Sequence, residues 1–87
     1  MTALSTAIER LDWFYDKQVE ELGREENQGK MEDWRENSLF DLEEAIHRHV
    51  SRLGLALFRG NRETITAECA HIANYAMMVA DTNQSRY

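Results

Sequence analysis

The stretch that decides the fold of this chain spans residues 68–81 and reads ECAHIANYAMMVAD. It is the most apolar run in the sequence and contains neither glycine nor proline, which predicts an uninterrupted helix. Its small residues alternate with larger apolar ones, so a neighbouring helix can approach closely on one side. Glu68, His71 and Asn74 recur every three residues and therefore share one stripe of this helix. Because buried polar groups need partners, other parts of the chain are expected to supply them.

A first helix is predicted over residues 3–25, with Thr2 or Ser5 as its N-cap. Its apolar residues follow one another in steps of three and four, which is the spacing of a single helix face. We interpret this helix as an ordinary amphipathic one that supplies both core and interface. The apolar seam consists of Leu4, Ile8, Leu11, Tyr15, Val19 and Leu22.

Two further helices are predicted over residues 38–59 and 62–81. Ser38 is a good N-cap for the earlier of the two, and Gly60 is the residue type that ends a helix with positive φ. Asn61 then caps the later helix, and the last six residues are expected to fray. Because the connection is so short, the two helices are expected to form an antiparallel hairpin.

The composition predicts a single all-α domain that covers residues 1–87. The chain has no proline and only four glycines, which favours long helices with few breaks. A chain of this size has a small core, and we expect apolar helix faces to complete it by forming a homodimer or a higher oligomer. The resulting architecture is a helical bundle shared between subunits.

Charge and cysteine content narrow the class of protein. Ten basic and 16 acidic residues give a net charge of −6, which argues against a nucleic-acid binder that works by neutralising phosphates. A single cysteine, Cys69, excludes an internal disulfide and fits a reducing compartment. No run reaches the length of a membrane span, and the N-terminus lacks the pattern of a signal peptide. We therefore expect a cytoplasmic protein.

The turn at Gly60-Asn61 predicts which residues of the hairpin face one another. Residues whose numbers sum to about 120 should lie at the same height. By this rule Glu68 faces Arg52, and His71 faces His49, with Arg48 one step away. The hairpin is thus expected to hold a polar cluster of these five residues. In its simplest interpretation the cluster is structural, with Glu68 paired to Arg52.

Metal binding is the alternative interpretation of these polar residues. Glu68, His71 and His49 make a set of two histidines and one carboxylate that suits a transition metal, although neighbouring arginines would repel a cation. The pairs Glu44–His47 and Glu68–His71 also match the E-x-x-H pattern of di-iron bundles. Within one chain those two pairs are about 13 Å apart along the helix axis, so they can meet only between subunits.

Three stretches within residues 27–81 carry a family resemblance. Residues 68–81 look like one conserved helix, and residues 38–57 look like the motif helix before it. Asn27, Lys30 and Trp34 look like a loop motif, with the spacing off by one. Together these stretches resemble the compact MazG-like proteins of the all-α nucleotide pyrophosphohydrolase superfamily, which are frequent in phage genomes.

The resemblance implies an acidic cage that holds Mg²⁺, built from E-E-x-x-E on one helix and E-x-x-D on the next. In this chain the first pattern falls on Arg48, His49 and Arg52, and the second falls on Glu68 and His71. Only Glu68 remains of the cage. We therefore interpret the magnesium site as dismantled and replaced by a basic pocket, since arginine binds phosphate without a metal.

The basic pocket favours a non-catalytic helical module that binds a nucleotide or phosphate ligand, with no cofactor expected. The resemblance implies that the module is phage-encoded, in which case it would act in the host cytoplasm, and blocking a host or defence protein is the other use that it implies. The alternative is a pyrophosphohydrolase with altered ligands that cleaves nucleoside triphosphates to monophosphate and pyrophosphate with Mg²⁺ or Mn²⁺. A structural or metal-binding oligomer is a further alternative. Trp34 either anchors its loop on the core or offers a stacking face to the ligand. The candidate ligand residues are Lys30, Trp34, Arg48, His49, Arg52, Glu68, His71 and Asn74.

Overall fold

The computed structural model describes residues 2–29 and 33–86, and within them the chain is all-α. Four elements follow one another: α1 (Ala3–Asn27), the short 3₁₀ helix η1 (Trp34–Glu36), α2 (Leu39–Arg59) and α3 (Arg62–Arg86). The predicted fold class and the three predicted main helices are confirmed. None of the described helices combines the length and the apolar character that crossing a membrane requires.

The helix ends follow from their capping residues. Thr2 and Ser5 form a reciprocal capping box at the start of α1. The Ser38 hydroxyl accepts a hydrogen bond from the amide of Asp41 at the start of α2, and Gly60 ends that helix with φ of +69°. Asn61 caps α3 by accepting from the amide of Thr64. The predicted cap at Ser38 and the predicted turn at Gly60-Asn61 are therefore confirmed.

Helix α3 runs further than the sequence predicts. It continues to Arg86, so the expectation that residues 82–87 fray is wrong for 82–86. The reason is tertiary: Thr82 is buried, and η1 covers the preceding turn. The Trp34 indole N–H donates to the Asp81 carboxylate at 3.1 Å, and the Arg35 Nε lies 3.3 Å from the same oxygen.

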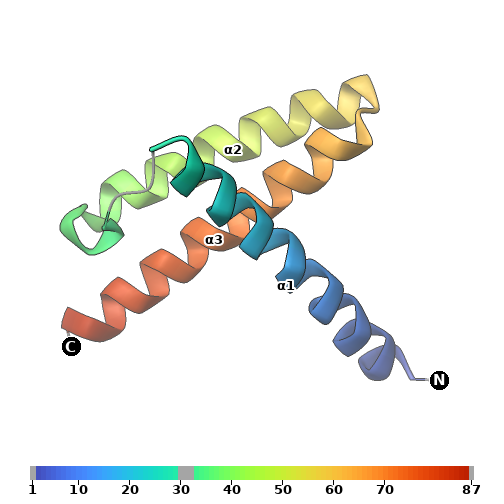
Figure 1. Ribbon diagram of the computed structural model, residues 1–87, viewed down its shortest axis with the longest axis horizontal. Coiled ribbons are helices and arrows are strands. Elements are labelled where there is room, and N and C mark those ends of the chain that lie inside the picture. Colours follow the sequence, from blue (N-terminus) through green and yellow to red (C-terminus); the bar gives the residue numbers. More distant parts are fainter. Residues whose placement is uncertain (1, 30–32, 87) are drawn as a thin grey trace.

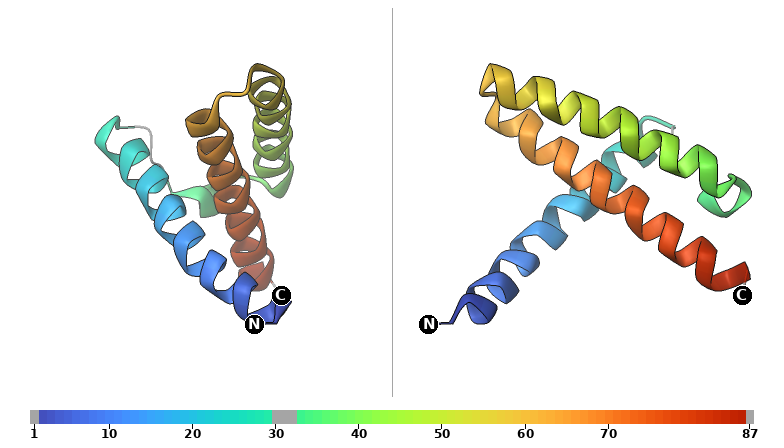
Figure 2. Two further views of the ribbon diagram at one scale, coloured as in Figure 1. Left: turned by 90° about the vertical axis from the view of Figure 1, so that its right-hand side faces the viewer. Right: turned by 180° about the vertical axis from the view of Figure 1, so that it is seen from behind.

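Helices α2 and α3 pack along each other as the predicted antiparallel hairpin (Figure 1). Helix α1 crosses the hairpin obliquely on the α3 side, so α3 lies between the other two helices (Figure 2). The apolar core among the described residues is small. Three of its buried side chains are alanines, which let the helices approach closely. The buried apolar residues are Leu42, Ala45, Ala56, Ala70 and Met78.

Most of the apolar seam of α1 does not enter this core. Leu4, Ile8, Leu11, Tyr15 and Val19 are 48–70% exposed, so the expectation that the seam supplies core within the chain is wrong for these five residues. Leu22, the last residue of the seam, is half-buried. The helix docks instead through a polar face that starts at Gln18. Its N-terminal half projects away from the hairpin (Figure 1).

Candidate functional site

A buried polar cluster lies at the point where the three helices meet. His49 stands in the middle of the buried stripe of α2 and is 7% exposed. Its Nδ1 lies 2.5 Å from the Oε2 of Glu68, which is itself buried on α3. The imidazole of His71 stacks on that of His49, with ring centroids 4.6 Å apart. The predicted juxtaposition of His49 with His71 is confirmed.

The partner predicted for Glu68 is wrong. Its carboxylate bonds to His49, and no ion pair joins it to Arg52 among the described residues. Equal height along a hairpin does not bring two side chains face to face, because the rotation of each helix decides that. The buried stripe of α2 passes through Ala45, His49 and Ala56, and Arg52 lies beside that stripe, where it is exposed.

Two carboxylates that the sequence analysis missed come from α1. The Nε2 of His71 lies 3.3 Å from Glu21, and its Nδ1 lies 3.3 Å from Glu25. Each ring nitrogen of His71 therefore faces a different carboxylate of α1. A signal was present in the sequence, because Gln18, Glu21 and Glu25 recur in steps of three and four, like the polar stripe of α3.

Beside the cluster, the three helices enclose a cavity of about 430 Å³ that we call the crossing pocket. Helix α1 supplies one wall, α2 the wall with the arginines, and α3 the floor. Within the described part of the chain, neither Arg48 nor Arg52 forms an ion pair or a hydrogen bond, whereas Arg24 is paired with Glu20 and Glu21. The lining residues are Glu21, Arg24, Glu25, Gln28, Arg48, His49, Arg52, His71 and Tyr75.

Tyr75 links the crossing pocket to the cluster. Its ring stacks on His49 with centroids 5.5 Å apart. Burial raises the pKa of Tyr75 above its ordinary value, the charge of Glu25 raises it further, and Arg48 and Arg52 act in the opposite direction. The hydroxyl therefore remains a hydrogen-bond donor at neutral pH, and both arginines are close enough to act on it electrostatically.

Two other candidate ligand residues, Asn74 and Trp34, do not line this pocket. Asn74 is buried at the crossing of α1 with α3, where Gln18 satisfies both ends of its amide at 3.1 Å. The indole N–H of Trp34 is bonded to Asp81, which is the anchoring role rather than a free stacking face. Lys30 lies outside the described residues.

Neither metal-binding interpretation of the sequence finds a preformed site among the described residues. Among residues 2–29 and 33–84, no group of three or more His, Cys, Asp or Glu side chains is arranged to hold a metal ion. The ring nitrogens that would face a metal are used by carboxylates: His49 by Glu68, and His71 by Glu21 and Glu25. The other E-x-x-H pair, Glu44 with His47, is exposed on α2.

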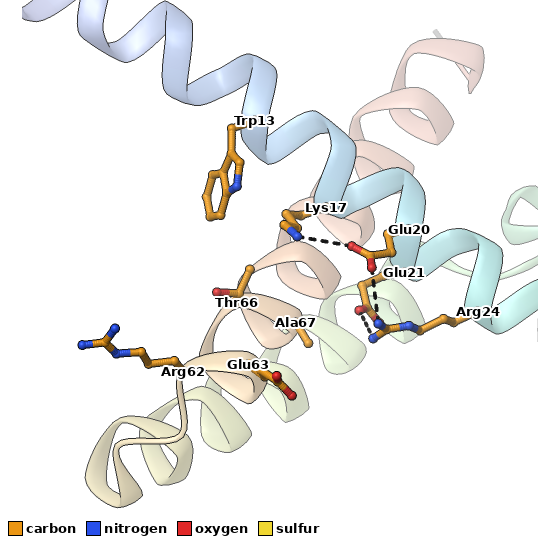
Figure 3. A pocket seen from close by; sticks show the side chains of 9 residues that line it. All are labelled: Trp13, Lys17, Glu20, Glu21, Arg24, Arg62, Glu63, Thr66 and Ala67. Atoms are coloured by element: carbon orange, nitrogen blue, oxygen red, sulfur yellow. Dashed lines mark hydrogen bonds and ion pairs between the residues drawn. The ribbon is translucent and has the colours of Figure 1, made fainter.

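A second cavity of about 410 Å³ lies on another side of α1, opposite the start of α3 (Figure 3). Trp13 forms one end of it, with the Arg10 guanidinium 4.6 Å from its ring centroid. Most of its charged side chains neutralise one another, because Lys17 pairs with Glu20 and Arg24 pairs with both Glu20 and Glu21. It thus offers less free positive charge than the crossing pocket.

No family model, curated protein or solved structure matches this chain. The family resemblance therefore remains a hypothesis from sequence patterns. The chemistry of the cluster and of the crossing pocket is the basis on which function is inferred below.

Proposed function

We propose that this chain is a non-catalytic binding module that takes a phosphate-bearing ligand of the nucleotide class in the crossing pocket. One observation carries the proposal: Arg48 and Arg52 line the same cavity without a carboxylate partner among the described residues. Guanidinium groups bind phosphate oxygens in a fixed fork geometry, so two unpaired arginines that line one cavity offer an external anion a place to bind.

The remaining lining of the pocket supports an anionic ligand. Glu21 and Glu25 would repel phosphate if they stood alone, but His71 lies between them and Arg24 pairs with Glu21. The Tyr75 hydroxyl adds a neutral donor beside the two free guanidiniums. A cavity of about 430 Å³ falls within the size range of small-molecule sites.

The same residues argue against a magnesium-dependent reaction. If the resemblance to the MazG-like family is correct, Arg48, His49 and Arg52 stand where carboxylates would hold Mg²⁺. A cation entering the pocket would meet guanidinium groups instead. The one remaining cage residue, Glu68, is bonded to His49.

The enzymatic alternative has one observation in its favour, which is that Glu21 and Glu25 add two carboxylates at the pocket wall. These could act as altered ligands for Mg²⁺ or Mn²⁺ in a nucleoside triphosphate pyrophosphohydrolase. Incubation with nucleoside triphosphates and either metal distinguishes the two functions. Pyrophosphate release that disappears in Glu21→Gln and Glu25→Gln would overturn the non-catalytic proposal.

Calorimetric titration with pyrophosphate and with nucleoside triphosphates, in the presence of a chelator, tests the binding function. Arg48→Ala and Arg52→Ala should each weaken binding by roughly 10- to 100-fold, because each removes a charge-assisted hydrogen bond of about 1.5–3 kcal/mol. Arg59→Ala is the matched control, since it removes an equally exposed arginine of α2 that does not line the pocket. Equal losses in all three variants would indicate a general charge effect and contradict a built site.

Blocking of a host or defence protein is a second candidate use of this fold. The observation that favours it is the exposure of Phe58 and Phe40, at 91% and 82% of their surface. Such exposed aromatics are typical anchors of protein interfaces. If no phosphate ligand shifts the melting temperature, the binding function falls and the blocking function remains.

Self-association completes the proposal. Among the residues that the structure describes, five apolar side chains are buried and three of these are alanines, which is a small core for an 87-residue chain. A shared interface is the ordinary way for such a chain to bury more apolar surface. We therefore expect a homo-oligomer, with each subunit carrying its own crossing pocket.

A further inference from the structure

The N-terminal half of α1, which projects away from the hairpin and which we call the free half, carries an apolar surface that the chain itself does not cover. Leu4, Ile8, Leu11, Tyr15 and Val19 form one stripe, and all five are about half exposed or more. We name these five residues the α1 stripe. We propose that the α1 stripe is the interface for a second copy of this chain, in which two α1 helices pair antiparallel about a two-fold axis near Leu11.

The surface area of the chain supports this interface. A folded monomer of 10.2 kDa is expected to expose about 5,300 Å². The chain exposes 6622 Å², which is about 1,300 Å² more than that expectation. A standard interface buries about 800 Å² on each partner, so the excess is large enough to supply one.

The shape of the chain agrees with its surface. Its radius of gyration is 14.3 Å, whereas a compact chain of 87 residues is expected to have one of about 12 Å. The excess extension comes from the half of α1 that projects beyond the hairpin (Figure 2). A partner that packs along this half would restore a compact particle.

The positions of the α1 stripe favour a second copy over an unrelated partner. In the antiparallel pair, residues whose numbers sum to 22 or 23 lie opposite each other on the two copies. Leu4 then faces Val19, Ile8 faces Tyr15, and Leu11 faces Leu11 of the other copy. The stripe is therefore complementary to itself when two helices run in opposite directions, which is the requirement of a two-fold interface. It also lies roughly a quarter turn from the polar face that docks on α3, so both contacts can exist together.

The exposed aromatics of the hairpin do not offer an equivalent surface. Phe40 and Phe58 stand at opposite ends of α2, about 27 Å apart along its axis. Val50 and Leu57, also exposed, lie on a different side of the same helix. These residues do not form one continuous stripe, and we therefore place the self-interface on α1.

Sedimentation or light scattering across a concentration series tests the interface. The wild type should have twice the mass of one chain, and Leu11→Asp should shift the particle to the mass of one chain, because it places two carboxylates at the two-fold axis. Phe58→Asp is the matched control, because it introduces the same charge at a side chain that is more exposed than Leu11 and lies outside the α1 stripe. The dimer should persist in this variant. Circular dichroism checks that both variants keep their helix content. A monomeric wild type, or a dimer lost only in Phe58→Asp, would overturn the proposal.

Cross-linking tests the direction of the pairing. In a Cys69→Ala background, Leu11→Cys should form a disulfide with itself, and a mixture of Leu4→Cys with Val19→Cys should form the mixed dimer. A parallel pairing would instead join Leu4→Cys to itself efficiently, and that result would overturn the antiparallel arrangement.

This inference does not rest on phosphate binding. Titration of the monomeric Leu11→Asp variant with pyrophosphate separates the two proposals, because the crossing pocket lies wholly within one chain. Unchanged affinity together with a lost dimer is the expected result. Loss of affinity in this variant would show that the pocket needs the second copy and would contradict the placement of the interface away from it.

Discussion

The two halves of α1 use opposite chemistry. The C-terminal half docks on the hairpin through Gln18, Glu21 and Glu25, and their partners on α3 are Asn74 and His71. The N-terminal half carries most of the α1 stripe and touches nothing comparable within the chain. In most amphipathic helices the apolar face enters the core and the polar face meets the solvent. Here the polar face is the one that holds the helix on its own chain.

An apolar stripe on a helix therefore indicates a surface for packing, but it does not show whether the partner is the rest of the same chain or another molecule. Polar contacts of the docked half are directional, so they fix the angle at which α1 crosses α3. Apolar contacts of the free half are not directional, and they suit a second copy that approaches from the side. The docked half therefore positions the crossing pocket, while the free half carries the surface that we propose for self-association.

The largest expected effect comes from breaking the buried pair beneath the docked half. His49→Ala leaves the Glu68 carboxylate without its partner in a buried site, which should lower the free energy of unfolding by about 3–5 kcal/mol. Urea denaturation followed by circular dichroism measures this loss. His47→Ala is the control, since His47 is exposed on the same helix and its removal should cost little.

A double variant measures how much the contact between His49 and Glu68 itself contributes to stability. His49→Ala combined with Glu68→Ala should cost less than the sum of the two single changes, by about 1–3 kcal/mol. Strictly additive losses would mean that the contact between His49 and Glu68 contributes nothing to stability.

A smaller effect is expected when the docking contact itself is removed. Asn74→Ala deletes both hydrogen bonds to Gln18 in a buried position and should cost about 1–3 kcal/mol. Hydrogen exchange should show faster exchange in the docked half of α1, with little change in α2. Gln84→Ala, at an exposed position of α3, is the control. Uniform loss of protection over all three helices would contradict a local docking role.

The sequence was sufficient for everything that depends on local periodicity. The spacing of apolar residues and the caps at Ser38 and Asn61 predicted the hairpin, and the turn predicted that His49 meets His71. The crossing of α1 over α3 brings together residues that are far apart in the sequence, such as Gln18 and Asn74 at a separation of 56 positions, and no local pattern encodes its angle. For that reason Glu21 and Glu25 were missed, and for the same reason the apolar seam of α1 was expected to supply core within the chain as well as an interface.

A gain of stability is expected from a glycine inside the docked half of α1. Gly23 lies inside α1, and a Cβ added there would meet no atom within 4 Å. Gly23→Ala should therefore raise the free energy of unfolding by about 0.5–1 kcal/mol, because alanine loses less backbone entropy in a helix. Thermal denaturation measures the gain. Gly54→Ala in α2 has equally open space and should give a similar increase. A loss of stability at Gly23 alone would show that α1 needs a glycine at this position of its docked half.

The smallest effect concerns one tyrosine in each region, Tyr75 at the crossing and Tyr15 on the stripe. Burial raises the pKa of Tyr75, so the folded state favours its protonated hydroxyl more than the unfolded state does. The stabilisation is fully present below the ordinary pKa of 10.0 and is lost as the pH rises through the higher folded value. Tyr75→Phe should thus reduce the decline in stability above about pH 10, by less than about 1 kcal/mol. Tyr15→Phe is the matched control, because it removes the same hydroxyl outside the crossing. Ultraviolet titration of tyrosinate, compared between wild type and Tyr75→Phe, assigns the late-titrating group.

A pyrophosphate ion bound beside Arg48 and Arg52 would cancel their lowering influence on the pKa of Tyr75 and would delay this titration further. An unchanged titration in saturating pyrophosphate would place the ion elsewhere.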